Sequence, residues 1–386
     1  MTAPAQPTDL PDTFLPDQLV VHLPYRDLVI QELHRLGVEP ASPPKEDERL
    51  GLALLTLVTT DRKKKVTDLD PLLAQLRAVC GLRYGGWVPL LGKNRQVESV
   101  FGLPQPKSHA LDDLARTQGP LPLYSAPGDG RGVRVGVLDT KIIPHPDLVG
   151  RFVADPTEIH PPADGPIELR APHATFVTSV IIGRAQSAVV EAIGVLGDDG
   201  LATAWDTVTQ MMAFADAGVD ILNLSLGCRT ADGRPPLLMA RAAQLLSQRM
   251  LLVAAAGNHH LSATPNAPTW PAALPDVVAV GALDPDGTPS DFSPRLPWLT
   301  CSAPGRDIVG AYTTGPVKML DGTVDEFKTG YAEWSGTSFA TAAVSGAVAA
   351  RTVPGKVSPR DALRALLAEP GGVVRPWVLG DDGSRA

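Results

Sequence analysis

The sequence predicts an α/β protein with a doubly wound, mostly parallel sheet preceded by a smaller α/β domain. After residue 132, short and almost wholly apolar runs alternate with helical patterns, as expected for parallel strands buried on both faces. Before residue 101 lies a separate strand–helix–strand–helix pattern of about 85 residues, and a Pro- and Gly-rich stretch divides the two parts. A chain of 386 residues is long enough for two domains.

The smaller domain is predicted over 17–101, after a flexible tail at 1–16 that is rich in Pro, Thr and Asp. A strand-like run at 19–23 leads into a helix that places Val29, Leu33 and Leu36 on one face. A second strand and a second, leucine-striped helix follow, and two short apolar stretches close the domain. We expect the second strand at 50–58 and the second helix from Asp70-Pro71 onward, with Asp70 as its cap. The two apolar stretches lie at 87–91 and 97–101.

The stretch 102–131 is predicted to be a linker, because it contains five prolines and four glycines. The larger domain is predicted over 132–370, followed by a second flexible tail at 371–386. Its expected strands lie at 133–138, 189–196, 221–225, 250–255 and 277–280, with helices at 202–217, 237–248 and 342–350.

Composition excludes several classes of function. A net charge of −8 argues against binding nucleic acid through a basic face. Three widely spaced cysteines indicate buried thiols rather than a disulfide framework, and none forms a metal-type C-x-x-C pair. The adjacent His259-His260 is interpreted as a surface loop rather than a metal site. We therefore expect no metal and no cofactor.

No apolar run approaches the roughly 20 residues that a membrane span needs. The first residues carry neither a basic segment nor an apolar one, so they do not resemble a secretory signal peptide. The expected location is cytoplasmic, and secretion by a route that the sequence does not reveal is the alternative.

Three short motifs carry candidate catalytic residues. A buried strand ends at Asp139, an apolar helix opens at His173, and Ser338 stands at the start of a helix of small residues. Serine is a weak nucleophile, so it needs a base such as histidine to take its proton, and a carboxylate to orient that base. Strand ends and helix starts on one side of a parallel sheet bring distant residues together. These three residues are therefore predicted to form a catalytic triad.

A fourth candidate is Asn258, which follows the predicted strand 250–255. An amide at a strand end can donate a hydrogen bond to the oxyanion of a tetrahedral intermediate. Asn258 is therefore predicted to stabilise that oxyanion.

These motifs together resemble those of the subtilisin-like serine peptidases, which share the order Asp, His, Ser. The resemblance covers roughly 132–355 and includes the segments Asn223–Gly227 and Ala254–Asn258. It implies a subtilisin-like fold in which one segment pairs with the substrate backbone and another lines the pocket for the residue before the cut. The residues so implied are Ser225, Leu226 and Gly227 for pairing, and Ala256 and Gly257 for the pocket.

The chain departs from the family pattern at Lys141, Ala174 and Phe176, where the family usually carries Gly, Gly and His. None of the three replaces a triad residue. Many family members bind calcium, and the sequence locates no such site here.

The position of the 17–101 domain resembles that of the family's inhibitory propeptide. The resemblance implies that this domain blocks the cleft until cleavage within 102–131 releases it; an uncleaved accessory domain is the rival interpretation. The predicted partners are a peptide or protein substrate and the chain's own N-terminal domain.

The predicted function is that of a serine endopeptidase acting through an acyl-enzyme, with a precursor-maturation protease as a narrower form. The alternative is a catalytically impaired pseudoprotease that binds peptides in the same cleft.

Overall fold

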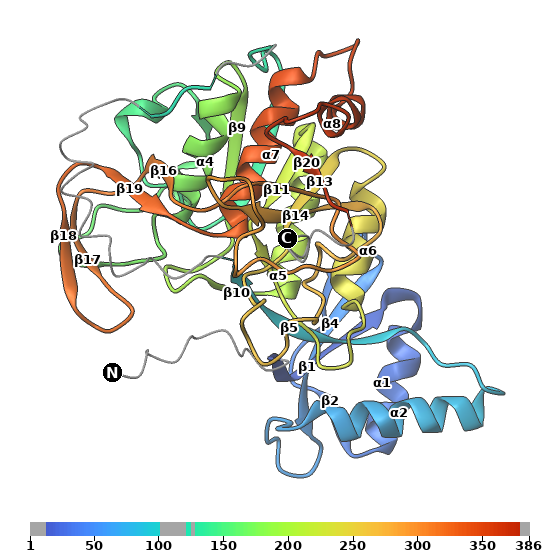
Figure 1. The fold of residues 1–386 in the computed structure, drawn as a ribbon. Coiled ribbons are helices and arrows are strands. Elements are labelled where there is room, and N and C mark those ends of the chain that lie inside the picture. The colour runs from blue at the N-terminus through green and yellow to red at the C-terminus, as the bar shows by residue number, and fades with distance from the viewer. Residues whose placement is uncertain (1–12, 101–120, 125–127, 379–386) are drawn as a thin grey trace.

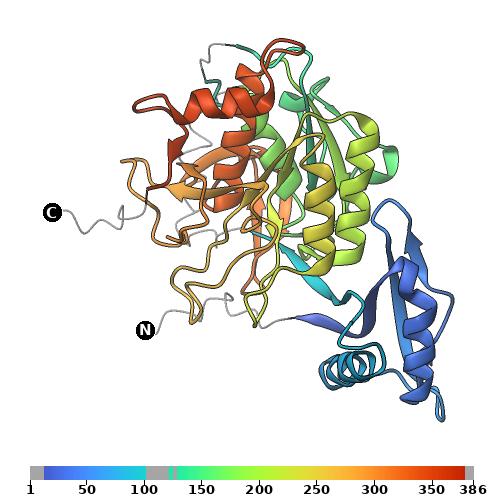
Figure 2. The same ribbon diagram turned by 90° about the vertical axis from the view of Figure 1, so that its right-hand side faces the viewer.

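A computed structural model describes residues 13–100, 121–124 and 128–378 (Figure 1). Most of the predicted tail 1–16 and of the predicted linker 102–131 lie outside these residues. The described part forms a small N-terminal domain and a larger C-terminal domain, which pack against each other (Figures 1 and 2).

The N-terminal domain is a sheet with two helices on one face. Its strands are β1 Phe14–His22, β2 Val38–Pro40, β3 Lys45–Asp47, β4 Leu52–Thr59 and β5 Leu91–Ser99. Its helices are α1 Arg26–Arg35 and α2 Leu69–Arg83. The strand order is β5-β1-β4-β2, with β3 also paired to β4.

Alternation along β1 explains how this sheet joins the two domains. Leu19 and Val21 face α1 and α2, whereas Val20 packs with residues of the larger domain. Both faces of the sheet are therefore buried, one beneath its own helices and one against α5 Ala204–Ala217 and α6 Leu237–Leu246 (Figure 2). The side chain of Asn94 accepts a hydrogen bond from Trp205 N (2.9 Å) in the first turn of α5, so the small domain caps that helix.

The larger domain is built on an eight-stranded sheet in the order β20-β15-β14-β13-β11-β6-β9-β7. All its neighbouring strands are parallel except β15 and β20. The strands are β6 Arg134–Asp139, β7 Phe152–Val153, β9 Val189–Gly194, β11 Ile221–Leu224, β13 Leu251–Ala255, β14 Val277–Leu283, β15 Cys301–Pro304 and β20 Arg375–Pro376.

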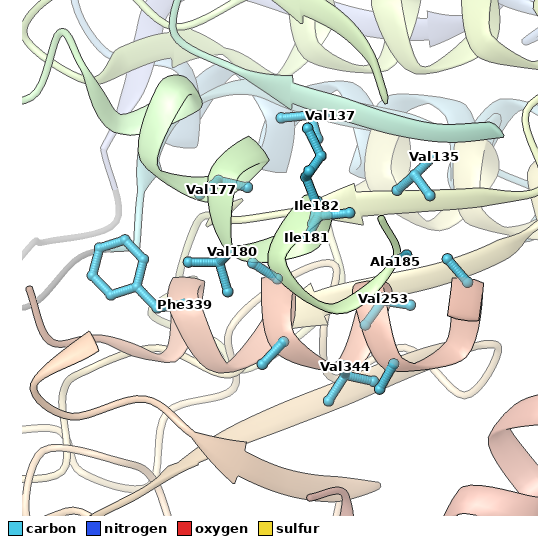
Figure 3. Close-up of a cluster of buried hydrophobic side chains, with 14 of the residues drawn as sticks. Val135, Val137, Val177, Val180, Ile181, Ile182, Ala185, Val253, Phe339 and Val344 are labelled. Atoms are coloured by element: carbon cyan, nitrogen blue, oxygen red, sulfur yellow. The ribbon is translucent and has the colours of Figure 1, made fainter. Parts of the chain in front are cut away.

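Helices cover both faces of this sheet. On one side lie α4 His173–Arg184, α7 Thr337–Arg351 and α8 Pro359–Leu367, and on the other lie α5 and α6. Figure 3 shows side chains of β6, α4, β13 and α7 directed toward one another in the first of these cores. The small residues of α7 allow a close approach, because a Cβ on Gly346 would lie 2.7 Å from Ile181 O of α4. The prediction of a doubly wound, mostly parallel sheet is confirmed.

Short strands extend the domain beyond the main sheet. They are β8 Ile167–Glu168, β10 Leu201–Thr203, β12 Leu226–Gly227, β16 Ile308–Ala311, β17 Gly315–Lys318, β18 Val324–Phe327 and β19 Tyr331–Trp334. Of these, β10 and β12 matter most for the site, because both pair with β5 of the N-terminal domain.

The structure differs from the sequence prediction at three places. Residues 14–16 and 375–376 belong to strands, although 1–16 and 371–386 were expected to be flexible tails. Each pairs with a strand edge that the local sequence does not reveal, Phe14 with Arg95 and Pro376 with Cys301. The second helix begins before Pro71, since Asp68 caps it by accepting from Asp70 N (3.1 Å).

The short stretches expected at 87–91 and 97–101 are also different from the prediction. One strand, β5, runs from Leu91 to Ser99, because its polar middle is held by pairing with β1 on one side. Across the described ranges, no helix has the length and apolar composition required to cross a membrane.

Candidate active site

Asp139 and His173 form a buried pair at the carboxyl end of the parallel sheet. Asp139 is the last residue of β6 and His173 the first of α4, and both are 0% exposed. His173 Nδ1 lies 2.7 Å from Asp139 Oδ1 and 2.9 Å from Oδ2. A carboxylate at this distance holds the proton on Nδ1 and leaves Nε2 as the basic nitrogen.

Thr140 ties the two residues together. Its backbone N–H donates to Asp139 Oδ1 (2.7 Å), and its hydroxyl donates to Ala171 O (2.9 Å). The same hydroxyl accepts from Ala174 N (3.1 Å) in the first turn of α4. The end of β6 and the start of α4 are thus joined by one side chain, which fixes where the imidazole stands relative to the carboxylate.

Aromatic rings surround the imidazole of His173. Trp334 meets it edge-on with 5.7 Å between ring centroids, and Phe339 lies at 5.6 Å. Phe176, at a position where the family usually has His, packs on Phe339 at 4.5 Å. Phe176 therefore extends the apolar surroundings of the His173 ring, and the contact between His173 and Asp139 is kept.

Ser338 is the second residue of α7, and its hydroxyl faces two carbonyl groups. Its Oγ hydrogen-bonds to Val100 O and lies 3.2 Å from Ser225 O. Its backbone N–H belongs to the first turn of a helix, where N–H groups have no intrahelical acceptor. A nucleophile placed there has donors beside it for a developing negative charge.

A buried chain of hydrogen bonds supports the backbone of Ser338. Ser225 Oγ donates to Ser338 O (3.1 Å), Asn223 Nδ2 donates to Ser225 Oγ (2.9 Å), and Ser345 Oγ donates to Asn223 Oδ1 (3.0 Å). Asn223 and Ser345 were not predicted as site residues. Their only sequence signal is a polar residue in an otherwise apolar strand or helix.

Asn258 follows β13 and points its amide toward the start of α7. Thr337 N donates to Asn258 Oδ1 (2.9 Å), which leaves the Nδ2 group as the free end of the amide. Within the described residues, the buried Nδ2 has no hydrogen-bond partner. An unsatisfied buried donor is costly, so it indicates a place where an acceptor binds.

Ala256 and Gly257 lie between β13 and Asn258. Ala256 N donates to Val280 O (3.0 Å), and Gly257 N donates to Thr337 Oγ1 (3.1 Å). The structure thus joins this segment to Thr337, the residue before Ser338. That the two residues line a pocket for the substrate stays a prediction.

Of the adjacent histidines, His259 differs from the expectation of a surface position, whereas His260 is partly exposed. His259 is buried, and its Nε2 lies 2.8 Å from Ala267 O. Burial lowers the pKa of His259 to about 4, so this ring is neutral at ordinary pH. Its hydrogen bond with Ala267 O stabilises the loop that follows Asn258.

The N-terminal domain inserts strand β5 between two edge strands of the larger domain. On one side β5 pairs antiparallel with β12, Leu226 opposite Ser99 and Gly227 opposite Glu98. On the other side it pairs with β10. Val100 N donates to Ser225 O (3.0 Å), so the backbone hydrogen bonds continue from β5 to the residue that contacts Ser338. The three residues implied for substrate pairing, Ser225 to Gly227, are those that hold β5.

Lys141 lies beside the end of β9. Its Cγ is 2.7 Å from where a Cβ on Gly194 would stand, and Glu158 Oε2 is 2.9 Å from the same point. Among the described non-glycine residues, positive φ occurs at Lys63 and Asp307 and not at Lys141. Lys141 therefore occupies its position without the backbone strain that a glycine site would impose.

The candidate metal ligands and the cysteines can be placed among the described residues. Within the described ranges, no group of three or more His, Cys, Asp or Glu side chains is placed to hold a metal ion. Cys80, Cys228 and Cys301 are buried free thiols. Burial raises the pKa of Cys228 and of Cys301 to about 12, so neither is a reactive thiolate.

Comparison with known proteins places the chain among peptidases. The model of the subtilase family matches residues 130–369. Subtilisin BL from Lederbergia lenta is 31% identical over 247 residues, which are 61% of this chain and 81% of that protein. The thermophilic serine proteinase of Bacillus sp. (strain AK1) is 30% identical over 203 residues, 50% of this chain and 48% of the relative. The chain thus spans about half the length of that relative.

A solved structure resembles more of the chain than the family match covers. Fervidolysin from Fervidobacterium pennivorans, described as a keratinolytic enzyme related to subtilisin, superposes with a TM-score of 0.62. The likeness covers 92% of this chain and 57% of fervidolysin at 17% identity. At this identity the likeness concerns the fold alone, and its extent includes most of the N-terminal domain.

Proposed function

Because this chain belongs to the subtilase family, we propose that it is a serine endopeptidase that cleaves peptide bonds through an acyl-enzyme. One observation carries the proposal. The hydroxyl of Ser338 meets the carbonyl oxygen of Val100 at the end of a strand that is paired on both sides. A peptide held in this way has its carbonyl group beside the Ser338 hydroxyl, which is the proximity that attack requires.

The proposed reaction uses the residues as follows. Ser338 Oγ attacks the carbonyl carbon while His173 Nε2 takes the hydroxyl proton, and Asp139 stabilises the imidazolium. Asn258 Nδ2 and the Ser338 N–H donate to the oxyanion. His173 then gives its proton to the leaving amine, and a water molecule, deprotonated by the same imidazole, hydrolyses the ester and restores Ser338.

The N-terminal domain is proposed to be an intramolecular inhibitor that the enzyme cuts from itself. Strand β5 pairs antiparallel with Leu226–Gly227, the edge proposed to hold a substrate, and Val100 is the residue whose carbonyl meets Ser338. The bond presented for cleavage is then Val100–Phe101, immediately before the linker 102–131 in which cleavage was expected. The cut fragment stays bound through the burial of Val20, Leu52 and Val97 against the larger domain.

The proposal is tested with a fluorophosphonate probe and intact mass. The processed protein should gain the mass of one probe, which peptide mapping assigns to Ser338 and not to Ser225 or Ser345. Protein unfolded in denaturant is the control, since its serine hydroxyls are no longer activated. Absence of label both in the folded full-length chain and in the protein trimmed of its N-terminal domain would establish the pseudoprotease alternative instead.

Release of the N-terminal fragment should depend on pH through Glu98. This side chain lies on β5 within the cleft and faces Arg170 and Arg229. Burial raises its pKa from 4.5 to about 7, and the two arginines oppose this more weakly. The docked state therefore binds a proton more readily than the released fragment. Docking is favoured at low pH and weakens as pH rises from 4.5 through 7.

We expect the dissociation constant of the cut fragment to rise about 100-fold between about pH 5 and about pH 8.5. Binding can be followed by fluorescence anisotropy of the labelled fragment. Glu98→Gln should remove most of this dependence, and Glu48→Gln, on the exposed surface of the same domain, should keep it. Tighter docking at high pH in the wild type would contradict the prediction.

The narrower role of a precursor-maturation protease is a second proposal. It is supported by the enclosed course of β5, whose Val97 and Ser99 are 0% and 3% exposed, because enclosed side-chain positions select among substrate sequences. Efficient digestion of casein at many sites by the processed enzyme would refute this role and leave the endopeptidase proposal standing.

A further inference from the structure

The position of Ser99, directly before Val100, is closed on one side by Gly200 and Arg170. Ser99 N donates to Gly200 O (2.9 Å), so the two backbones lie side by side. A Cβ on Gly200 would stand 2.6 Å from Ser99 Oγ and 2.9 Å from Arg170 Cδ. The Ser99 hydroxyl and the aliphatic part of Arg170 therefore both lie within 3 Å of the same point beside Gly200. We call the space around the Ser99 side chain the Ser99 subsite.

Two contacts hold Arg170 in place. Its guanidinium donates through Nη1 to Asp199 O (2.8 Å), and its carbonyl accepts from His173 N (3.0 Å) in the turn that opens α4. One end of Arg170 is thus tied to the loop before β10 and the other to the catalytic base. To swing away and admit a larger residue, the side chain would have to break the hydrogen bond of its guanidinium to Asp199 O.

The Ser99 subsite selects a side chain by its size and not by the presence of a hydroxyl group. The Ser99 Oγ atom is buried and has no hydrogen-bond partner among the described residues. An unsatisfied hydroxyl contributes nothing to docking, so a methyl group would serve at least as well. What the surroundings specify is that the side chain be short.

We propose that Arg170, seated over Gly200, limits the substrate residue immediately before the attacked one to a small side chain. Glycine, alanine and serine fit, and leucine or an aromatic residue collides with the Arg170 stem. The inference rests on the proposed endopeptidase function and names a selectivity of that same cleft. The determinant is the aliphatic stem and not the positive charge.

The test uses self-cleavage of the full chain, followed by the mass of the fragment ending at Val100. Ser99→Ala should be processed at least as fast as the wild type. Ser99→Leu should slow cleavage on the order of 100-fold, because steric exclusion removes productive binding. Adding Arg170→Ala to Ser99→Leu should restore the rate to within about tenfold of the wild type.

Two variants separate the stem from the charge. Arg170→Met keeps most of the stem without the charge and should leave Ser99→Leu blocked. Arg229→Ala removes the other positive charge that faces Glu98 and should also leave it blocked. Circular dichroism and thermal unfolding identify any variant that has lost its fold. In that case the processed wild-type enzyme is assayed with two peptides, whose residues before the cleaved bond are Val-Gln-Ala-Val or Val-Gln-Leu-Val. The peptide with leucine should be cleaved at least about 30-fold more slowly than the one with alanine.

The outcomes are distinguishable. Cleavage of Ser99→Leu at the wild-type rate, or rescue by Arg229→Ala as effective as rescue by Arg170→Ala, would overturn the inference while leaving the endopeptidase in place. The inference would also be overturned if the Ser99→Leu chain carrying Arg170→Ala folds but is still not cleaved faster than Ser99→Leu alone. A wild-type chain that cuts neither itself nor the peptides would instead remove the proposed function on which the inference rests.

Discussion

Replacing Ser338 by alanine is expected to slow self-cleavage about a million-fold, so that the chain keeps its N-terminal domain. Subtilisin, a member of the same family, loses activity on this scale when its catalytic serine is removed. His173→Ala should cost about as much, because the hydroxyl is a poor nucleophile without its base. The double variant should be no slower than either single one, since the two residues act as a unit.

Intact mass and gel analysis over hours to days measure this prediction. Ser358→Ala is a suitable control, because it removes a serine hydroxyl that caps α8 by accepting from Asp361 N and does not contact the Val100 carbonyl. It should still be processed. Persistent, site-specific cleavage at Val100–Phe101 in Ser338→Ala would show that another group or a contaminating protease performs the cut.

Asp139→Asn is expected to slow self-cleavage by about 10,000-fold without unfolding the protein. Asparagine has the same shape, but its amide cannot replace a carboxylate between Thr140 N and His173 Nδ1. If the amide donates to Nδ1, the ring proton moves to Nε2, and the imidazole can no longer accept the proton of Ser338. Unlike removal of the serine, this change leaves the nucleophile in place, so its effect is smaller.

The processing half-life measures the effect, with thermal unfolding as a check on the fold. Asp147→Asn is the matched control, because that carboxylate accepts from Tyr331 OH (2.6 Å) and lies outside the triad. It should be processed at nearly the wild-type rate. Equal losses in the two variants would mean that Asp139 acts only through stability.

Much of the candidate site follows from local sequence. Asp139 ends an apolar strand, His173 begins an apolar helix and Ser338 begins a helix of small residues. Residues at these junctions share one edge of a parallel sheet whatever their separation along the chain. Their order and the neighbouring Asn258 segment were therefore sufficient to nominate them and to identify the family.

Other features could not be predicted from local sequence. The polar middle of β5 has no strand pattern of its own, and it is a strand because β1, β10 and β12 pair with it. His259 looks like a loop residue, yet it is buried by the segment that returns to Ala267. For β5, contacts between distant segments outweigh local preference, and for His259 the fold of its own loop decides the burial.

By itself, then, the sequence determined the alternation of strands and helices, the residues able to form a triad, and the presence of a separate N-terminal domain. These depend on local periodicity and on the chemistry of single side chains. Only the tertiary structure decided that Val100, rather than a residue within 102–131, meets Ser338, and that Ser99 and Arg170 both lie beside Gly200. The register of β5 is set by its pairing with β10 and β12, which lie more than 100 residues away along the chain. A change of register by one residue would turn every side chain of the strand to the opposite face.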